Sequence, residues 1–554
     1  MFPSHSFIAR VFSWKPAVVN RSNAPTNTEL QGFAPLDFSQ ALLAMIGIAL
    51  VSMLIALDQT VVSTALPSIV EDLKGFEYYT WVANGYLLAS IAVVPVFGRL
   101  GDLFGRKPFV VASVVIFTIG SILCGLADSM PMLVAARALQ GLGGGMMVGN
   151  AFASVADMFP DAHARVRWQV VIAAAYGIGT ASGPSLGGLL TEQYGWRSTF
   201  LINLPVGLAS LYCLWRYLPA IRHPQGTSRA KVRIDIAGAL LITWVLASLQ
   251  LFVERVPETG LAGSTWLLLA AVIVGTVLFL ICEHRASHPI IPLDLFRERD
   301  LVMLLGLSVL MGFIMFSLLF FTPLLLQGGF GLAPHEAGLL ATPLAVCIAI
   351  GSMLNTRIVV RLRRPVKILT TGFTFMLVAS LALAGTQIRT PHLILVAALM
   401  LAGVGLGFSI NNLNVFSQNI VGRERFGIIT ALLQSTRMVG GMLGTTLIGT
   451  VVSLRYASNI DAKVQLLFPS GTPAALAERL RDPQVLLDTQ GQAQIVDALR
   501  GMPIRPETLL AAAREVLVDA VHSGMLATAL AAVAAIVLTW RLLHLRLAPA
   551  KAQS

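Results

Sequence analysis

The chain alternates between long apolar runs and short polar connections. A helix needs about 20 apolar residues to cross the ~30 Å hydrocarbon core of a bilayer. About fourteen runs approach or exceed that length, which predicts about fourteen membrane-spanning helices. These runs fall near residues 41–66, 78–97, 109–127, 131–153, 168–190, 198–218, 235–253, 264–282, 301–326, 337–356, 366–385, 392–413, 427–453 and 522–545.

The cations of the connections are distributed unevenly between the two predicted sides of the membrane. On one side the connections carry clusters of lysine and arginine. On the other side the short connections carry only isolated cations, at Lys74, Arg197, Arg255 and Arg389. Because lysine and arginine accumulate in cytoplasmic loops, both termini are expected in the cytoplasm. The clusters that define this side fall within residues 98–108, 165–167, 216–233, 285–299, 357–367 and 423–425.

The composition supports a polytopic membrane protein. Hydrophobic residues make up 56% of the 554 positions and charged residues only 12%, about half the share in soluble domains. The net charge of +11 is spread over the connections, which argues against a nucleic-acid-binding patch. The four cysteines all lie in apolar runs without metal-ligand spacing, so no metal site, disulfide framework or cofactor is expected. The polar first 38 residues lack a signal-peptide pattern, and the first helix is expected to be an uncleaved anchor.

A faint internal repeat divides the chain. Residues 141–150 resemble residues 403–412, and the basic segment ending at Pro108 has a counterpart ending at Pro365. Parallel repeats of six helices indicate a transporter with its substrate site between the halves. The predicted division is a cytoplasmic arm (1–38), a six-helix bundle (39–218), two inserted helices with flanking loops (219–300), a second six-helix bundle (301–545) with an external loop (455–521), and a cytoplasmic tail (546–554).

Residues 98–108 form a short basic hairpin between two apolar runs. Glycine at 98 and 105 permits a tight turn, and Arg106 and Lys107 suit the cytoplasmic side. A signal that only sets the membrane topology needs cations and no acid. Asp102 therefore suggests an ion pair that is made and broken as the helices move. A hairpin that only sets topology is the alternative.

Two charged residues interrupt apolar helices. Arg137 lies in the segment Arg-Ala-Leu-Gln-Gly-Leu-Gly-Gly-Gly, where an intramembrane arginine is expected to face a cavity or a partner. Asp58 follows some seventeen mostly apolar residues, and burial favours the neutral form of a carboxyl group, which suits proton uptake and release. The alternatives are an Arg137 that reaches the membrane surface and an Asp58 that caps a helix break before Pro67.

The run at 168–190 is rich in glycine. Glycines four residues apart form a smooth ridge that another helix can approach closely, and a proline inside the helix can bend it. A bendable helix of this kind suits rocking between two halves. The residues concerned are Gly179, Gly183, Pro184, Gly187 and Gly188.

Together these segments resemble the signatures of the fourteen-helix drug:proton antiporter branch of the major facilitator superfamily, the QacA/EmrB type. The resemblance covers the hairpin, the Arg137 and glycine-rich segments, and Leu57–Pro67, with departures at Leu103, Val170, Ser63 and Thr64. It implies the major facilitator fold and antiport of protons. It also implies that Asp58 and Arg137 take part in proton coupling.

For the hairpin, the resemblance implies a conformational latch that keeps the cytoplasmic side closed in the outward-facing state. The latch residues are Gly98, Asp102, Gly105, Arg106 and Lys107, and Asp157 is the acid expected to pair with Arg106. The second copy of the hairpin has Val359 where Asp102 would align, so the acidic part of the latch is confined to the first half.

Polar and aromatic residues within the apolar runs are candidates for a substrate cavity, although each could instead join helices. Arg437 is notable because it lies in the middle of a run and has no evident partner in the sequence. The candidates are Trp81, Asn84, Tyr86, Gln140, Asn150, Asn203, Asn411, Asn412, Gln434 and Arg437.

The expected function is therefore proton-coupled efflux of hydrophobic compounds, cationic ones included, across a bacterial cytoplasmic membrane. No phosphate-binding loop for a nucleotide is present, and the chain is not expected to be an enzyme. The alternatives are an exporter of one metabolite and, more remotely, a sensor or enzyme that does not transport. The loop at 455–521 is interpreted as a lid, or as a docking surface for a periplasmic adaptor subunit.

Overall fold

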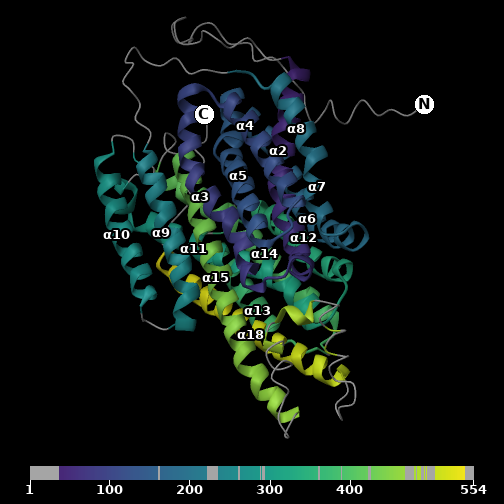
Figure 1. Ribbon diagram of the computed structural model, residues 1–554. Helices are drawn as coiled ribbons and strands as arrows, with labels where there is room; N and C mark the ends of the chain where they lie inside the picture. Colours follow the sequence, from purple (N-terminus) through teal and green to yellow (C-terminus); the bar gives the residue numbers. More distant parts are fainter. Residues whose placement is uncertain are drawn as a thin grey trace, which may run out of the picture.

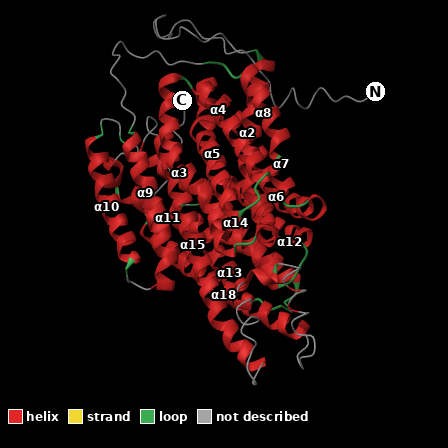
Figure 2. Cartoon of the chain, in the orientation of Figure 1, coloured by secondary structure: helices red, strands yellow, loops and turns green. Residues whose placement is uncertain are grey.

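The structure is a computed structural model that describes residues 37–542 with several short gaps. The described residues form helices and connecting loops, without a strand (Figure 2). The predicted N-terminal arm and C-terminal tail lie almost entirely outside them. The gaps are residues 160–161, 221–234, 260–262, 287–288, 290–292, 360–361, 363, 389, 422–425, 468–479, 482, 488–491, 493–494 and 496–505.

Fourteen long helices and the short helix α7 (Arg197–Leu201) build the described part of the molecule (Figure 1). The long helices are α2 (Phe38–Leu73), α3 (Tyr79–Phe104), α4 (Arg106–Gly125), α5 (Met130–Met158), α6 (Ala162–Tyr194), α8 (Asn203–Tyr217), α9 (Ile236–Thr259), α10 (Ser264–Arg285), α11 (Arg299–Leu324), α12 (Pro334–Val359), α13 (Lys367–Ala384), α14 (His392–Val421), α15 (Phe426–Leu467) and α18 (Pro506–Arg541).

Eleven segments of the described chain are long and apolar enough to cross a bilayer. Helices α5, α6 and α9 are the other three long helices. Helix α5 carries Arg137 among its glycines, and the apolar part of α9 is limited to Ala237–Val253. All three nevertheless pack among the spanning helices. The expected all-helical polytopic membrane fold is confirmed.

The helices form two halves with the same internal packing. In the first half α2 packs against α6 and α8, α5 packs against α3 and α4, and α4 also packs against α8. In the second half α11 packs against α15 and α18, α14 packs against α12 and α13, and α13 also packs against α18. Each helix therefore has a counterpart six positions later, once α9 and α10 are set aside. This arrangement agrees with the weak sequence repeat.

A matched pair of asparagines marks the same helix crossing in each half. Asn150 of α5 donates through Nδ2 to the Phe97 carbonyl oxygen of α3, at 2.9 Å. Asn412 of α14 donates through Nδ2 to Oδ1 of Asn355 of α12, at 2.6 Å. Both asparagines therefore act within one half and hold neighbouring helices in register.

The halves meet mainly along three pairs of helices: α6 with α12, α3 with α15, and α2 with α11. The inserted helices lie at the edge of the bundle, with α9 against α3 and α15 and α10 against α9 (Figure 1). The central interface is thus left to the twelve helices of the two halves.

The turn between α3 and α4 identifies one end of the bundle, called the hairpin end below. Gly105 at this turn has φ +88°, a conformation that other residues rarely adopt. At the opposite end, α15 and α18 project beyond their neighbours (Figure 1). Residues 455–467 and 506–521, which the sequence places in a loop, belong to these two helices. Much of the intervening chain lies outside the described residues.

Candidate functional site

A buried ion pair lies inside the first half. Nη1 of Arg137, from α5, is 2.7 Å from Oδ2 of Asp58, from α2. Both residues are about 1% exposed. A charge is unfavourable in a membrane interior unless a partner and hydrogen bonds compensate it. Asp58 and Arg137 each supply the charge that the other requires.

Amides complete the hydrogen bonding of this carboxylate. Nε2 of Gln140 donates to Oδ1 of Asp58 at 2.7 Å, and Nδ2 of Asn203 donates to the same oxygen at 3.3 Å. Oε1 of Gln140 also accepts a 2.6 Å hydrogen bond from Arg137. We call Asp58, Arg137, Gln140 and Asn203 the buried charge cluster.

Helix α3 holds the arginine from its other side. The guanidinium carbon of Arg137 lies 4.7 Å from the centre of the Tyr86 ring. Its Nε donates to the Val82 carbonyl oxygen at 3.2 Å. The cluster therefore connects α2, α3, α5 and α8. A change in the charge of Asp58 would be felt by four helices of the first half, because Arg137 would be left buried without its anion.

Asp58 does not cap a break in its helix in this arrangement. Helix α2 continues through Pro67, and the carboxylate is bonded to side chains of α5 and α8.

The hairpin end carries a second ion pair, at 2.7 Å between Nε of Arg106 and Oδ2 of Asp157. The two side chains are 16% and 13% exposed. Arg106 begins α4 and Asp157 lies in the last turn of α5, so this contact joins two helices of the same half. Gly98 of α3 approaches Gly149 of α5 closely, and Lys107 is partly buried. The side chain of Asp102 lies outside the described part of the structure.

The glycines of α6 allow close packing against two different helices, α2 and α12. A Cβ added at Gly179 would lie 2.9 Å from the Met53 carbonyl oxygen of α2, and Gly183 and Gly187 also face α2. A Cβ at Gly188 would lie 2.3 Å from the Pro334 carbonyl oxygen, at the start of α12. Pro184 meets Gly338 of α12 just as closely. One face of α6 therefore packs within its own half, and the other packs against the second half.

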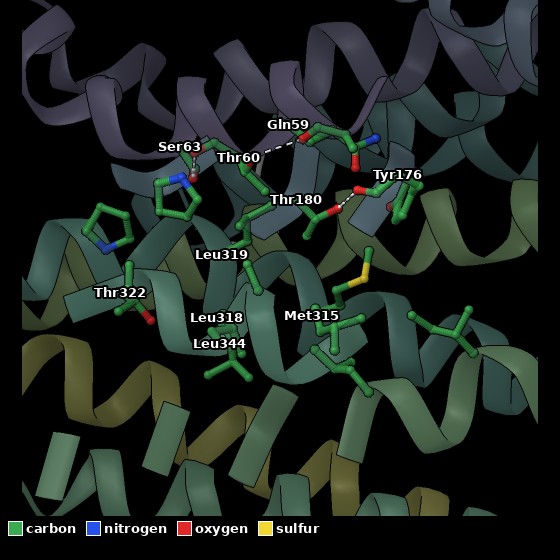
Figure 3. A pocket seen from close by; sticks show the side chains of 18 residues that line it. Gln59, Thr60, Ser63, Tyr176, Thr180, Met315, Leu318, Leu319, Thr322 and Leu344 are labelled. Carbon is green, nitrogen blue, oxygen red and sulfur yellow. Dashed lines mark hydrogen bonds between the residues drawn. The ribbon is translucent and has the colours of Figure 1, made fainter. Parts of the chain in front are cut away.

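A small cavity of about 40 Å³ lies between the halves (Figure 3). Drug-sized ligands generally occupy pockets of about 300–1,000 Å³, so the halves would have to separate to admit one here. Five of the six polar lining residues come from the first half, and the second half supplies a largely apolar wall together with Thr322 of α11. The lining includes Gln59, Thr60, Ser63, Tyr176, Thr180, Met315, Leu318, Leu319, Thr322, Leu344, Ile348, Leu406 and Ile410.

The sequence patterns did not mark the six polar residues of this lining as cavity candidates. Thr60 and Ser63 lie on the face of α2 opposite Asp58, because successive helical residues are about 100° apart. Tyr176 and Thr180 lie on α6 between its glycines. Such positions could have been recognised as a polar stripe beside the motif residues, but their common direction depends on how α2 and α6 pack.

The expected cavity residues lie in several other places. Tyr86, Gln140 and Asn203 belong to or contact the buried charge cluster. Trp81 and Asn411 are partly buried, on α3 and α14. Asn150 and Asn412 act within their own halves, Asn84 bridges the halves, and Gln434 and Arg437 contact each other on α15.

Hydrogen bonds join the halves away from the hairpin end. Asn84 of α3 donates to Oγ1 of Thr446 at 2.8 Å and accepts from Oγ1 of Thr445 at 2.5 Å. The hydroxyls of Ser185 and Thr342 lie 2.6 Å apart, between α6 and α12. We call this set of contacts the seal. Its further members are Tyr79 with the Phe320 carbonyl, Gln327 with the Thr64 carbonyl, and His335 with Glu192.

Comparison with known proteins places this arrangement in a family. The model of the Major Facilitator Superfamily matches residues 48–445. The multidrug transporter protein MdtP of Bacillus subtilis is 31% identical over 495 residues, covering 88% of this chain and 90% of that protein. The multidrug resistance protein Stp of Mycobacterium tuberculosis is 31% identical over 430 residues, covering 77% and 79%.

Solved structures show the same fold. A bacterial homologue of the human lysosomal transporter Spinster, in an inward-facing and unoccupied conformation, matches 94% of this chain and all of that chain, with a TM-score of 0.61 at 17% identity. This likeness concerns the fold alone. With the family match and the relatives, it identifies a multi-pass membrane protein that moves small molecules. The chain belongs to the major facilitator superfamily, as a transporter of the branch that contains these multidrug relatives.

Proposed function

We propose that this transporter exports hydrophobic compounds in exchange for protons, with its hairpin end and both termini in the cytoplasm. Relatives named as multidrug transporters support the cargo class. The positive charge of the hairpin supports the orientation. The observation that carries the proposal is the Asp58–Arg137 ion pair, which is buried and hydrogen-bonded within the first half.

In this proposal Asp58 carries the proton. When Asp58 binds a proton its charge is lost, and Arg137 remains in the membrane interior without a counterion. That state is strongly unfavourable, so helices around the cluster must move to give Arg137 another partner or water. Proton binding is thereby coupled to a change in helix packing. The membrane potential can drive the cycle, since each charge moved is worth about 2.3 kcal/mol per 100 mV.

Alternating access follows from the contacts between the halves. The seal holds the halves together at the end that we place outside, and opening at the hairpin end would expose the cavity to the cytoplasm. In the opposite state, the hairpin would close the cytoplasmic side, and the Arg106–Asp157 pair, which already fixes α4 against α5 in the present state, would hold the hairpin in position as the latch. Gly188 and Gly338 would allow α6 and α12 to meet and part.

The test is Asp58→Asn in proteoliposomes with an imposed pH gradient and a hydrophobic fluorescent dye as cargo. Asparagine keeps the size and polarity of the side chain but cannot carry the proton, so gradient-driven efflux should fall to the level of empty liposomes. Asp72→Asn is the matched control, because that carboxylate lies on the same helix, is half exposed and pairs with Arg197. Its efflux should stay near that of the unmodified protein.

Gradient-driven efflux by Asp58→Asn at the unmodified rate would exclude Asp58 as the proton carrier. Equal efflux with and without the gradient in the unmodified protein would exclude proton coupling altogether.

A further inference from the structure

A second intramembrane arginine remains after the buried charge cluster has been accounted for. Arg437 lies in α15, eleven residues after its start at Phe426. Its Nη2 donates to Oε1 of Gln434, one turn earlier on the same helix. Among the described residues, no carboxylate forms an ion pair with it. A cation in this position is uncompensated, and such residues mark functional sites in membrane proteins.

Arg437 lies beside the interface between the halves. Gln434, Gly441 and Thr445 share one face of α15, because steps of seven and four residues return to nearly the same helical direction. On that face Thr445 contacts Asn84 of α3, and Gly441 packs against Phe316 of α11, so the face lies between the first half and α11. Along α15, toward the hairpin end, Arg437 lies roughly 12 Å and Gln434 roughly 16 Å from Thr445 of the seal. Arg437 is partly exposed there.

The cavity adjoins this arginine on two sides. Tyr176, which lines the cavity from α6, is close enough to Arg437 to interact with it electrostatically. Gly312 of α11 packs against the backbone of Arg437, and Met315 of the cavity wall lies one turn further along α11. The guanidinium is therefore placed at the margin of the cavity.

The polar groups at this margin are chiefly hydrogen-bond donors. Arg437 has five N–H groups, of which the described contact with Gln434 uses one. The phenol of Tyr176 has no hydrogen-bond partner among the described residues and can donate. Such a set is suited to a carboxylate, sulfonate or phosphate, for which a guanidinium forms two parallel hydrogen bonds.

The adjoining wall is apolar apart from the hydroxyl of Thr322. Met315, Leu318, Leu319, Leu344 and Ile348 line it from α11 and α12. A ligand that satisfies both parts has an acidic group and a hydrophobic body. The carboxylate of Asp58 does not compensate the charge of Arg437, because Arg137, Gln140 and Asn203 already bind it.

We propose that Arg437, with Tyr176 and Gln434, binds the acidic group of an amphiphilic anion whose hydrophobic body lies in the cavity between the halves. This inference rests on the proposed function and names its cargo class as anionic. It replaces the sequence-based expectation of cationic cargo, since a cation would be repelled by the uncompensated guanidinium.

The test uses three probes with the same apolar body and different charge: pyrenebutyrate, pyrenebutanol and pyrenebutyl-trimethylammonium. Their binding to the purified full chain is measured by fluorescence in phospholipid-free detergent, without a proton gradient. Pyrenebutyrate should bind most tightly. Arg437→Gln should weaken it about tenfold or more, the usual effect of losing a charged hydrogen bond, and leave pyrenebutanol unchanged. Arg437→Lys should restore part of the loss.

Unchanged pyrenebutyrate affinity in Arg437→Gln would overturn the proposal, as would tighter binding of the trimethylammonium probe by the unmodified protein. Retained pyrenebutanol binding shows that the variant is folded. Added phosphatidylglycerol distinguishes the source of the anion: if it displaces pyrenebutyrate only when Arg437 is present, a lipid headgroup shares the site. Because no gradient is used, failure of proton coupling at Asp58 would leave this result unaffected.

Discussion

At the scale of single residues, the two intramembrane arginines differ in how their charge is compensated. Arg137 has a carboxylate at 2.7 Å, an amide oxygen at 2.6 Å and an aromatic ring at 4.7 Å. Arg437 has one described hydrogen bond, to an amide oxygen. A fully compensated charge stabilises one arrangement of helices, whereas an uncompensated one is available to a ligand. The same residue type therefore suits proton coupling in one half and cargo binding in the other.

Arg137→Lys tests whether the geometry of the first arginine matters beyond its charge. Lysine cannot contact Asp58, Gln140 and the Val82 carbonyl together, because its ammonium lacks the planar fork of a guanidinium. We expect the gradient-driven efflux rate to fall about tenfold or more, which corresponds to the ~1.4 kcal/mol of one weakened charged contact.

Arg197→Lys is the matched control. Arg197 also forms a 2.7 Å ion pair, with Asp72, but its side chain is 44% exposed. Exposed pairs contribute little, about 0–1 kcal/mol, so efflux should change less than twofold. Equal effects of the two substitutions would contradict a special role for the buried pair.

At the scale of helices, α6 is the element that couples the halves. Its glycines let it lie close to α2 on one face and to α12 on the other. Only a residue without a Cβ permits the backbone of α12 to approach at Gly188, because the atom opposite is a main-chain oxygen that cannot rotate away.

Gly188→Ala should therefore separate α6 from α12 at the seal. We expect at least a tenfold loss of efflux together with increased labelling of a cysteine at Ser185 by a membrane-impermeant maleimide added from outside. Ser185 is chosen because its hydroxyl lies at this contact.

Gly177→Ala provides the control on the same helix. A Cβ there would lie 3.6 Å from the Cβ of Ala349 in α12, an ordinary van der Waals distance. Efflux and labelling should remain as in the unmodified protein. A loss of efflux in Gly188→Ala without increased labelling would point to a folding defect instead of an opened seal.

At the scale of the whole molecule, the described hydrogen bonds between the halves gather at one end. Their number and position suit a state that is closed on the side away from the hairpin. The cavity of about 40 Å³ is too small for a drug-sized molecule in this state, so transport requires the seal to open.

A reversible cross-link tests that requirement. With the four native cysteines replaced by alanine, Ser185→Cys and Thr342→Cys together should form a disulfide between α6 and α12 under oxidising conditions. Efflux should stop on oxidation and return on reduction, while each single cysteine variant is unaffected by oxidant. Full transport by the cross-linked protein would show that the seal does not move.

Much of the fold follows from local properties of the sequence. The length of each apolar run is a property of consecutive residues, so the spanning helices could be predicted without knowing their neighbours. The weak repeat indicated two similar halves, and the charge of Asp58 and Arg137 within apolar runs identified the residues of the buried pair. At the far ends of α15 and α18 the helices extend into residues 455–521, because polar residues there continue them outside the apolar core.

The sequence by itself determined which residues are exceptional: buried charges, glycine ridges and a basic hairpin. Only the tertiary structure decided their partners. Asp58 and Arg137 are 79 positions apart, and they meet because α2 and α5 turn those faces toward each other. Helix rotation also directs Gly188 toward α12 and Gly183 toward α2. It likewise brings Tyr176 of α6 close to Arg437 of α15. Helix rotation and packing depend on all the neighbouring side chains at once, and the order of residues in one segment does not specify them.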